Sequence, residues 1–134
     1  MTASPFQPIQ QAIYNILTND STLMAKVTGV FDFVPDDKDY PYVTIGEATS
    51  IPYETYDRYG EEVSVVLHVW SRYRGMKQVN EIMDDCKRLL ARKSFAVTGW
   101  QNISCFHDFS EVIREPDGET RHGVIRFRIL ALQD

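Results

Sequence analysis

The sequence predicts an α+β fold in which an antiparallel or mixed β-sheet of about five strands packs against an N-terminal helix and a central amphipathic helix. Residues 62–70 alternate between apolar and polar side chains as a half-buried strand does, whereas residues 76–90 repeat apolar side chains at helical spacing. The chain has 134 residues, an ordinary size for one domain, and no linker or internal repeat divides it. We therefore expect one α+β domain that spans residues 1–134.

The first elements are expected to be helical. Residues 5–18 place their apolar side chains on one face of a helix, with Ser4 in position for an N-cap. A second, short helical turn follows, which either Asp20 or Ser21 could cap. The apolar face of the first helix consists of Ile9, Ala12, Ile13, Ile16 and Leu17.

Three strands are expected next. Residues 30–34 predict a short strand, and residues 42–45 predict another, which could extend to Thr49, after a polar loop closed by prolines. Residues 50–60 break the pattern and form a segment that is long for a hairpin loop and rich in tyrosine. The clearest strand, residues 62–70, turns four apolar side chains to one face, namely Val63, Val65, Leu67 and Val69.

A helix and a hairpin complete the expected order. Residues 76–90 predict a helix of about four turns whose apolar stripe faces the sheet. Residues 103–114 and 120–132 predict a long hairpin, because Pro and Asp-Gly between them favour a tight turn. The outer face of this helix and the residues just after it are expected to be charged. The charged residues are Lys77, Glu81, Asp84, Asp85, Lys87, Arg88, Arg92 and Lys93.

The charge balance argues against nucleic-acid recognition. The net charge is −5, from 14 basic and 19 acidic residues, whereas contact with phosphates requires a basic surface. The excess of acid lies in residues 1–60, which hold 3 basic and 8 acidic residues. This half of the chain is either a solvated acidic face or a surface that meets a basic partner.

No metal, cofactor or catalytic motif is expected. The two cysteines are isolated, and the histidines lie on separate predicted strands without the spacing of a metal site. His68, Cys105 and His107 could converge if their strands were neighbours, which makes a site geometrically possible, but packing or local hydrogen bonding is the commoner role. The sequence also has no signal-peptide pattern and no apolar run long enough to span a membrane.

The tyrosine-rich segment allows two interpretations. Tyr53, Tyr56 and Tyr59 are spaced by three residues in the expected loop 50–60, after Ile51 and Pro52. Some of these rings could fold back as a lid on the core. Alternatively they form a contact surface, because aromatic side chains give a large rigid area at low entropic cost and are enriched where protein partners meet.

Three features in a fixed order resemble the tail-completion, or tail-to-head joining, proteins of siphophages and their prophage relatives. The first is an N-terminal helix followed by Asp-Ser-Thr-Leu-Met-Ala-Lys-Val-Thr-Gly-Val-Phe. The second is a polar loop closed by Tyr-Pro-Tyr-Val-Thr-Ile-Gly. The third is the strand Val-Ser-Val-Val-Leu-His-Val-Trp-Ser-Arg-Tyr-Arg-Gly, which leads directly into the amphipathic helix. The resemblance covers roughly residues 9–93.

The resemblance implies a non-enzymatic structural role in the virion. Proteins of this kind cap the head-proximal end of the tail tube as a hexameric ring, contact the tail tube protein and the head connector (stopper) protein, and pass through the host cytoplasm during assembly. A ring needs two different contact patches on each subunit. The alternative is a small-ligand or peptide-binding module that uses the sheet face. The candidate contact residues are Ile51, Pro52, Tyr53, Tyr56, Arg58, Tyr59, Lys77, Glu81, Asp84 and Arg88.

Overall fold

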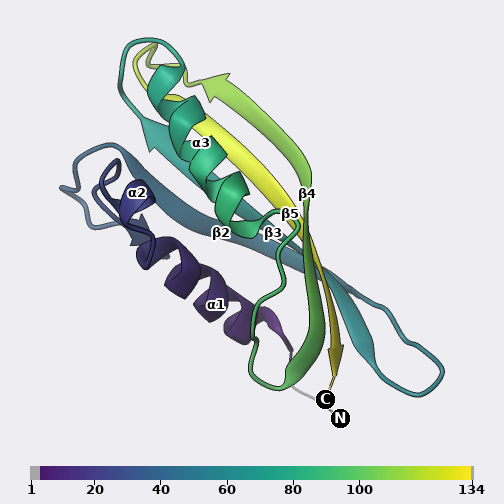
Figure 1. Ribbon diagram of the computed structural model, residues 1–134. Coiled ribbons are helices and arrows are strands. Elements are labelled where there is room, and N and C mark those ends of the chain that lie inside the picture. Colours follow the sequence, from purple (N-terminus) through teal and green to yellow (C-terminus); the bar gives the residue numbers. More distant parts are fainter. Residues whose placement is uncertain (1–3, 134) are drawn as a thin grey trace.

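The structure, a computed structural model, describes residues 4–133 without the side chain of Asn102. Three helices and five strands follow one another in an order close to the expected one (Figure 1). The elements are α1 (Phe6–Thr18), α2 (Ser21–Met24), β1 (Val30–Phe31), β2 (Tyr42–Pro52), β3 (Gly60–Ser71), α3 (Lys77–Leu90), β4 (Trp100–Arg114) and β5 (Arg121–Gln133). None of the helices in this part of the chain is long and apolar enough to cross a membrane.

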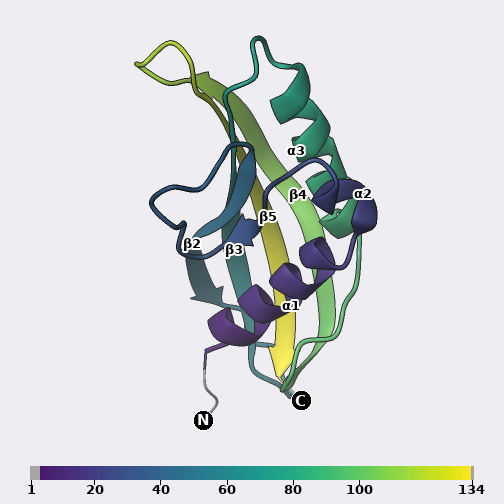
Figure 2. The same ribbon diagram turned by 90° about the vertical axis from the view of Figure 1, so that its left-hand side faces the viewer.

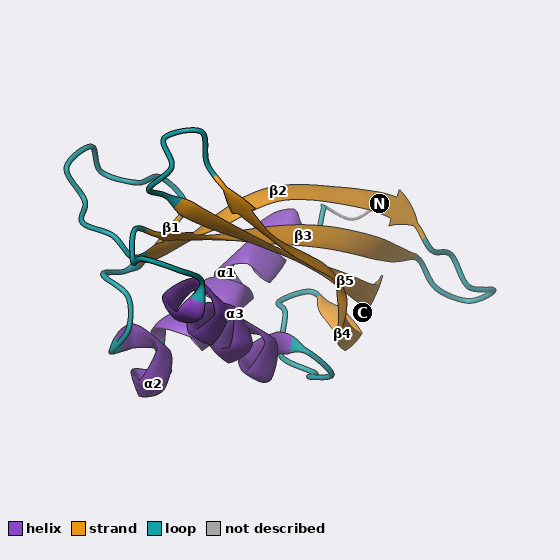
Figure 3. Cartoon of the chain, turned by 90° about the horizontal axis from the view of Figure 1, so that it is seen from above, coloured by secondary structure: helices purple, strands orange, loops and turns teal. Residues whose placement is uncertain are grey.

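The strands form one mixed sheet in the order β1-β2-β3-β5-β4, which confirms the predicted fold class. β1 runs parallel to β2, and the other three pairings are antiparallel. Figure 3 shows the helices on one face of the sheet, and the other face carries no helix. The polar loop between β1 and β2 projects on the side opposite α3 (Figure 2). The sheet therefore has one covered face and one open face.

The core lies between the helices and the covered face. β3 and β5 alternate, so that every second side chain enters the core while the next one points to the open face. α1 contributes Ile9, Ile13 and Leu17, all fully buried. The predicted strand face is confirmed, because the buried side chains of β3 include Val63, Val65, Leu67 and Val69. Those of β5 include Ile125, Phe127 and Ile129.

Side-chain oxygens accept hydrogen bonds from the first turns of α1 and α2, although the N-cap of α1 is Pro5 and not Ser4. Asp20, and not Ser21, caps α2, because its Oδ2 accepts a hydrogen bond of 2.9 Å from the backbone N–H of Leu23. The hydroxyl of Ser4 accepts a bond of 3.2 Å from the backbone N–H of Phe6, the first residue of α1. Each acceptor partners a backbone donor that the helix itself leaves unpaired.

A glycine lets α3 approach β5 closely. Gly123 faces the core, and a Cβ atom there would lie 2.5 Å from Sδ of Met83 and 3.0 Å from Cγ2 of Val79. Any larger side chain would therefore require the side chains of Met83 and Val79 to shift. This close contact seats the buried stripe of α3 directly on the strand.

Two expected boundaries are wrong. The strand expected over 30–34 ends at Phe31, and Phe33 is 83% exposed because the chain bends away from β2. The irregular loop expected over 50–60 is shorter, because β2 continues to Pro52 and β3 begins at Gly60. Cross-strand pairing explains the difference, since Ser50 and Ile51 pair with residues of β3 although their composition is typical of a loop.

The expected position of Asp85 is also wrong, because its side chain is buried and does not lie on the outer face of α3. Its carboxylate accepts a 2.8 Å bond from Nζ of Lys26 and lies 3.4 Å from the guanidinium of Arg88. Arg88 in turn lies 2.8 Å from Asp20, the cap of α2. These hydrogen-bonded partners raise the pKa of Lys26 and of Arg88 and lower the pKa of Asp20. The four side chains therefore tie α2 to α3.

Replacement of Asp85 by alanine should lower the free energy of unfolding by about 2 kcal/mol, because two cations lose a hydrogen-bonded partner at a buried position. Asp84→Ala is the matched control, since Asp84 is the exposed neighbour on the same helix. Urea denaturation measures both changes. Equal stability of the two variants would contradict the structural role of Asp85.

Candidate protein interface

The hairpin between β2 and β3 projects beyond the rest of the sheet (Figure 3). Its loop, residues 53–59, is closed by backbone hydrogen bonds. The N–H of Tyr53 donates to the carbonyl of Gly60 at 2.8 Å, and the N–H of Thr55 donates to the carbonyl of Arg58 at 2.9 Å. The tip therefore continues the pairing of the two strands through backbone hydrogen bonds.

The three tyrosines of the hairpin have different surroundings. Tyr56 is fully exposed, Tyr53 is 48% exposed and Ile51 is 59% exposed. Tyr59 is half-buried, with its hydroxyl 3.0 Å from Oε2 of Glu61 and its ring centroid 6.3 Å from that of Trp100. Burial and the bond to Glu61 raise the pKa of Tyr59. Tyr59 thus packs at the edge of the core, whereas the rings of Tyr53 and Tyr56 remain exposed and available for contact with a partner protein.

The remaining candidates are spread over two regions. Pro52 is exposed and Arg58 is half-buried in the hairpin. On α3, Lys77 and Asp84 are exposed and Glu81 is half-buried, whereas Arg88 is held in the ion pairs described above. The structure therefore gathers the hairpin candidates at one end and leaves the α3 candidates on a separate surface.

A hollow of about 360 Å³ lies where α2 meets α3. It lies on the helix side of the molecule, so it does not bear on the alternative of a ligand-binding module that uses the sheet face. Its lining consists of Ala25, Lys26, Tyr73, Lys77, Gln78, Glu81 and Ile82.

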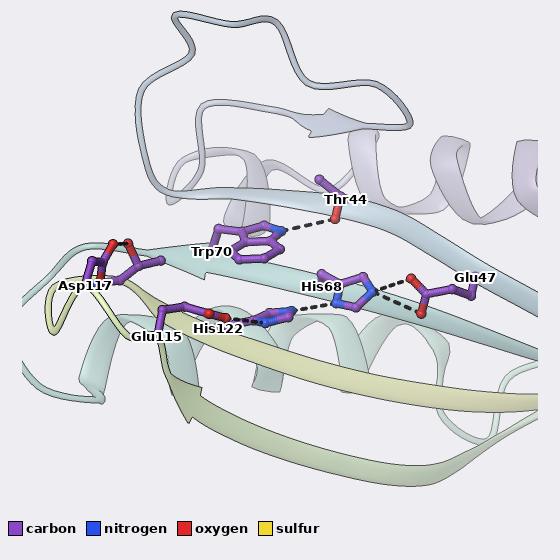
Figure 4. Close-up of polar contacts among 8 residues, drawn as sticks. Thr44, Glu47, His68, Trp70, Glu115, Asp117 and His122 are labelled. Carbon is purple, nitrogen blue, oxygen red and sulfur yellow. Dashed lines mark hydrogen bonds and ion pairs between the residues drawn. The ribbon is translucent and has the colours of Figure 1, made fainter.

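The open face of the sheet carries a hydrogen-bonded row of four titratable side chains, Glu47, His68, His122 and Glu115 (Figure 4). Nε2 of His68 lies 3.0 Å from Oε1 of Glu47, and Nδ1 of His68 lies 2.6 Å from Nε2 of His122. Nδ1 of His122 lies 2.9 Å from Oε1 of Glu115. We call these residues the histidine row.

Neighbouring residues hold both imidazole rings in place. The indole of Trp70 stacks on His122, with ring centroids 3.9 Å apart and planes 11° apart. Its Nε1 donates to the hydroxyl of Thr44 at 3.2 Å. A Cβ atom at Gly46 would lie 2.6 Å from Cδ2 of His68, so glycine leaves room for the ring. The row is therefore packed as well as hydrogen-bonded.

The outer and inner nitrogens of the two rings have different partners. Nε2 of His68 and Nδ1 of His122 face the carboxylates, whereas Nδ1 of His68 and Nε2 of His122 face each other. Which of these nitrogens donates depends on the tautomer of each ring. Burial lowers the pKa of His122 below its ordinary 6.5, against the bond to Glu115, and the charge of His68 lowers it further.

The convergence of His68 with Cys105 and His107 does not occur. Cys105 and His107 align in the register with Ile129 and Phe127, which belong to the covered face, whereas His68 lies on the open face. Burial raises the pKa of the Cys105 thiol to about 12, so it is a poor nucleophile. Among the described residues, no group of three or more His, Cys, Asp or Glu side chains is arranged to hold a metal ion.

The contact between His68 and His122 was not predicted from the sequence. Each histidine occupies the open-face position of its alternating strand, and this is the available signal. Their proximity depends on the register between β3 and β5, which sets His122 opposite Trp70 and diagonal to His68. A strand pattern gives the face of a residue but not its cross-strand neighbour.

The thermal stability of the protein should fall as the pH drops below 6.5. The unfolded chain takes up the His122 proton near this pH, whereas the folded chain resists it, so folding is favoured above this pH and disfavoured below it. His122→Gln should show a smaller fall in Tm over the same range. A wild-type slope in His122→Gln would contradict the assignment of this fall to His122.

Three matches relate the chain to known phage proteins. The model of the tail completion protein gp17 family matches residues 11–131. Tail completion protein gp17 of Bacillus phage SPP1 is 30% identical over 120 residues, which cover 90% of this chain and 89% of that protein. The solved structure of SPP1 gp17 matches with a TM-score of 0.64 and 28% identity, over 92% of this chain and 88% of the other.

A fourth match concerns the fold. A chain in the virion of a native gene transfer agent particle matches with a TM-score of 0.90 and 19% identity, over 98% of this chain and 99% of the other. At this identity the likeness shows a shared fold. The family match, in contrast, extends over most of the sequence and agrees with the resemblance seen in its motifs. The protein belongs to the tail completion protein gp17 family.

Proposed function

We propose that the protein caps the head-proximal end of a phage tail tube and joins the tail to the head connector, as a ring of subunits. In this role it acts as a structural part of the virion and not as an enzyme. Its partners are further copies of itself, the tail tube protein and the connector (stopper) protein.

Family membership and one structural feature support this proposal. The relatives are tail completion proteins, and the chain of the same fold comes from a virion particle. The feature that carries the proposal is the projecting hairpin, because its fully exposed Tyr56 and its half-exposed Tyr53 have no role in the core of their own chain. Rigid aromatic side chains that project in this way are typical of hot spots in protein interfaces.

The outer surface of α3 provides a second region for assembly. Lys77 and Asp84 are exposed and Glu81 is half-buried on a helix that already fills the core with its other face. Their charges are mixed, which suits a polar contact that forms late in assembly. We assign this surface to the contacts with the tail tube or connector and the hairpin to contacts within the ring.

The double variant Tyr53→Ser, Tyr56→Ser should fold normally but lose tail completion. Loss of one aromatic hot spot costs about 2 kcal/mol, so the association of subunits in the ring should weaken by at least about tenfold. Cells that make this variant should accumulate filled heads and separate tails, which electron microscopy can count. Tyr59 is left unchanged, because its ring packs on Trp100 and its loss would disturb the fold.

Tyr14→Ser is the matched control, because Tyr14 is 42% exposed but lies on α1, away from the hairpin. This variant should complete tails as the wild type does. The proposal for the hairpin would be wrong if the double variant, shown to be folded by circular dichroism, still joined tails to heads at the wild-type level.

A further inference from the structure

We propose that the hairpin tip of one copy docks on an arginine–phenylalanine patch on the open sheet face of the next copy. The inference rests on the proposed ring and names the two surfaces that would join its subunits. The patch consists of Phe106, Phe109, Arg126 and Arg128, on β4 and β5. The tip consists of the loop 53–59, which carries exposed tyrosines and carboxylates.

The register of the two strands builds the patch. Phe106 lies opposite Arg128 and Phe109 lies opposite Arg126, so the four side chains share the open face. Both phenylalanines are exposed to about two-fifths, at 39% and 41%, and both arginines are exposed. This combination of bare rings and cations is unusual on a solvated strand pair, where apolar groups are normally covered.

The two arginines differ in what they already bind. The guanidinium of Arg126 lies 5.1 Å from the centroid of the Phe109 ring, and its Nε donates to Asp108 at 2.8 Å. Arg128 makes no ion pair with any residue that the structure describes. Arg128 is therefore the cation that an incoming carboxylate would meet.

The tip has the complementary chemistry. Glu54 and Asp57 flank the fully exposed Tyr56, and neither carboxylate forms an ion pair within the described part of the chain. Arginine binds carboxylates through its paired N–H groups and also stacks on aromatic rings. The tyrosines of the tip can in turn pack on the phenylalanines of the patch. The acidic tip and the basic patch are thus complementary in charge, and both carry exposed aromatic rings.

The distribution of exposed apolar groups fits a head-to-tail contact. Ile51, Tyr53 and Tyr56 gather at the hairpin, whereas Phe106, Phe109 and Ile113 gather on β4. A ring requires two different patches on each subunit, in contrast to the single self-complementary patch of a symmetric dimer. The chain offers two such patches of unlike chemistry.

A tip cannot reach the patch of its own chain. Arg128 lies opposite Ser64 in β3, eight residues along the chain from Tyr56. At the rise of an extended strand this separation is up to roughly 25 Å, and the hairpin points away from the sheet. The contact must therefore form between copies.

Cysteine cross-linking tests the contact. The double variant Thr55→Cys, Ser104→Cys keeps the tyrosines of the tip and the phenylalanines of the patch, because Thr55 lies beside Tyr56 and Ser104 lies on the same face of β4 as Phe106. Bound to tails assembled without this protein and treated with a short bis-maleimide, it should give a ladder of covalent oligomers. Each single variant alone should stay unlinked, whereas a mixture of the two should give dimers. The native cysteines should not interfere, because both are buried and burial raises the pKa of each thiol to about 12.

Charge reversal adds a rescue test. Arg128→Glu should reduce the yield of the ladder at least tenfold in the cysteine variant, and Glu54→Arg in the same chain should restore it, on the order expected for a charge pair in an interface. Arg74→Glu, at an exposed arginine outside the patch, should have no effect. Circular dichroism checks that each variant is folded.

The outcomes separate this inference from the proposed function. If the cysteine variant completes tails but gives no ladder, or if Glu54→Arg does not rescue Arg128→Glu, the docking contact is wrong while the role in tail completion stands. If the unaltered protein fails to restore the joining of tails to heads, the proposed function itself is wrong.

Discussion

The packing of α1 and α3 against a single face of the sheet is the constraint on which the other features depend. Because β3 and β5 alternate, burial of one set of side chains commits the other set to the open face. Gly123 allows α3 to lie close to β5, and the Asp85 network holds α2 to the same helix. The core is completed on one side only, and everything on the other side of the sheet is free to serve contacts with water or with partners.

The open face divides into two regions of different character. Near the turn between β4 and β5, the histidine row and Trp70 form a packed polar cluster whose groups satisfy one another. Nearer the hairpin, the rings and cations of the arginine–phenylalanine patch remain exposed. A satisfied cluster stabilises the sheet without attracting a partner, whereas exposed rings beside a cation are suited to binding one. The asymmetry points to the second region as the one used in assembly.

Local pattern predicted the elements and the covered face, but not the relations between distant residues. The alternation around Leu67 was sufficient to predict a strand, and the helical repeat around Ile82 was sufficient to predict a helix, because each pattern depends on residues that are close in the sequence. Asp85 was misplaced because its burial depends on Lys26 of a remote turn. The expected loop between β2 and β3 was too long, because pairing with β3 makes Ser50 and Ile51 part of a strand although their composition is typical of a loop. Tyr59 could not be distinguished from Tyr53 and Tyr56 by spacing alone, since its place is decided by contact with Trp100.

Electron cryomicroscopy of tails with the bound protein, at a resolution that shows side chains, tests the central claim most directly. The account predicts a ring in which each hairpin tip, with Tyr56 at its end, lies on β4 and β5 of the neighbouring subunit, close to Arg128. A ring in which the tips point to solvent or into the tail tube, with the open sheet face of every subunit uncovered, would contradict it.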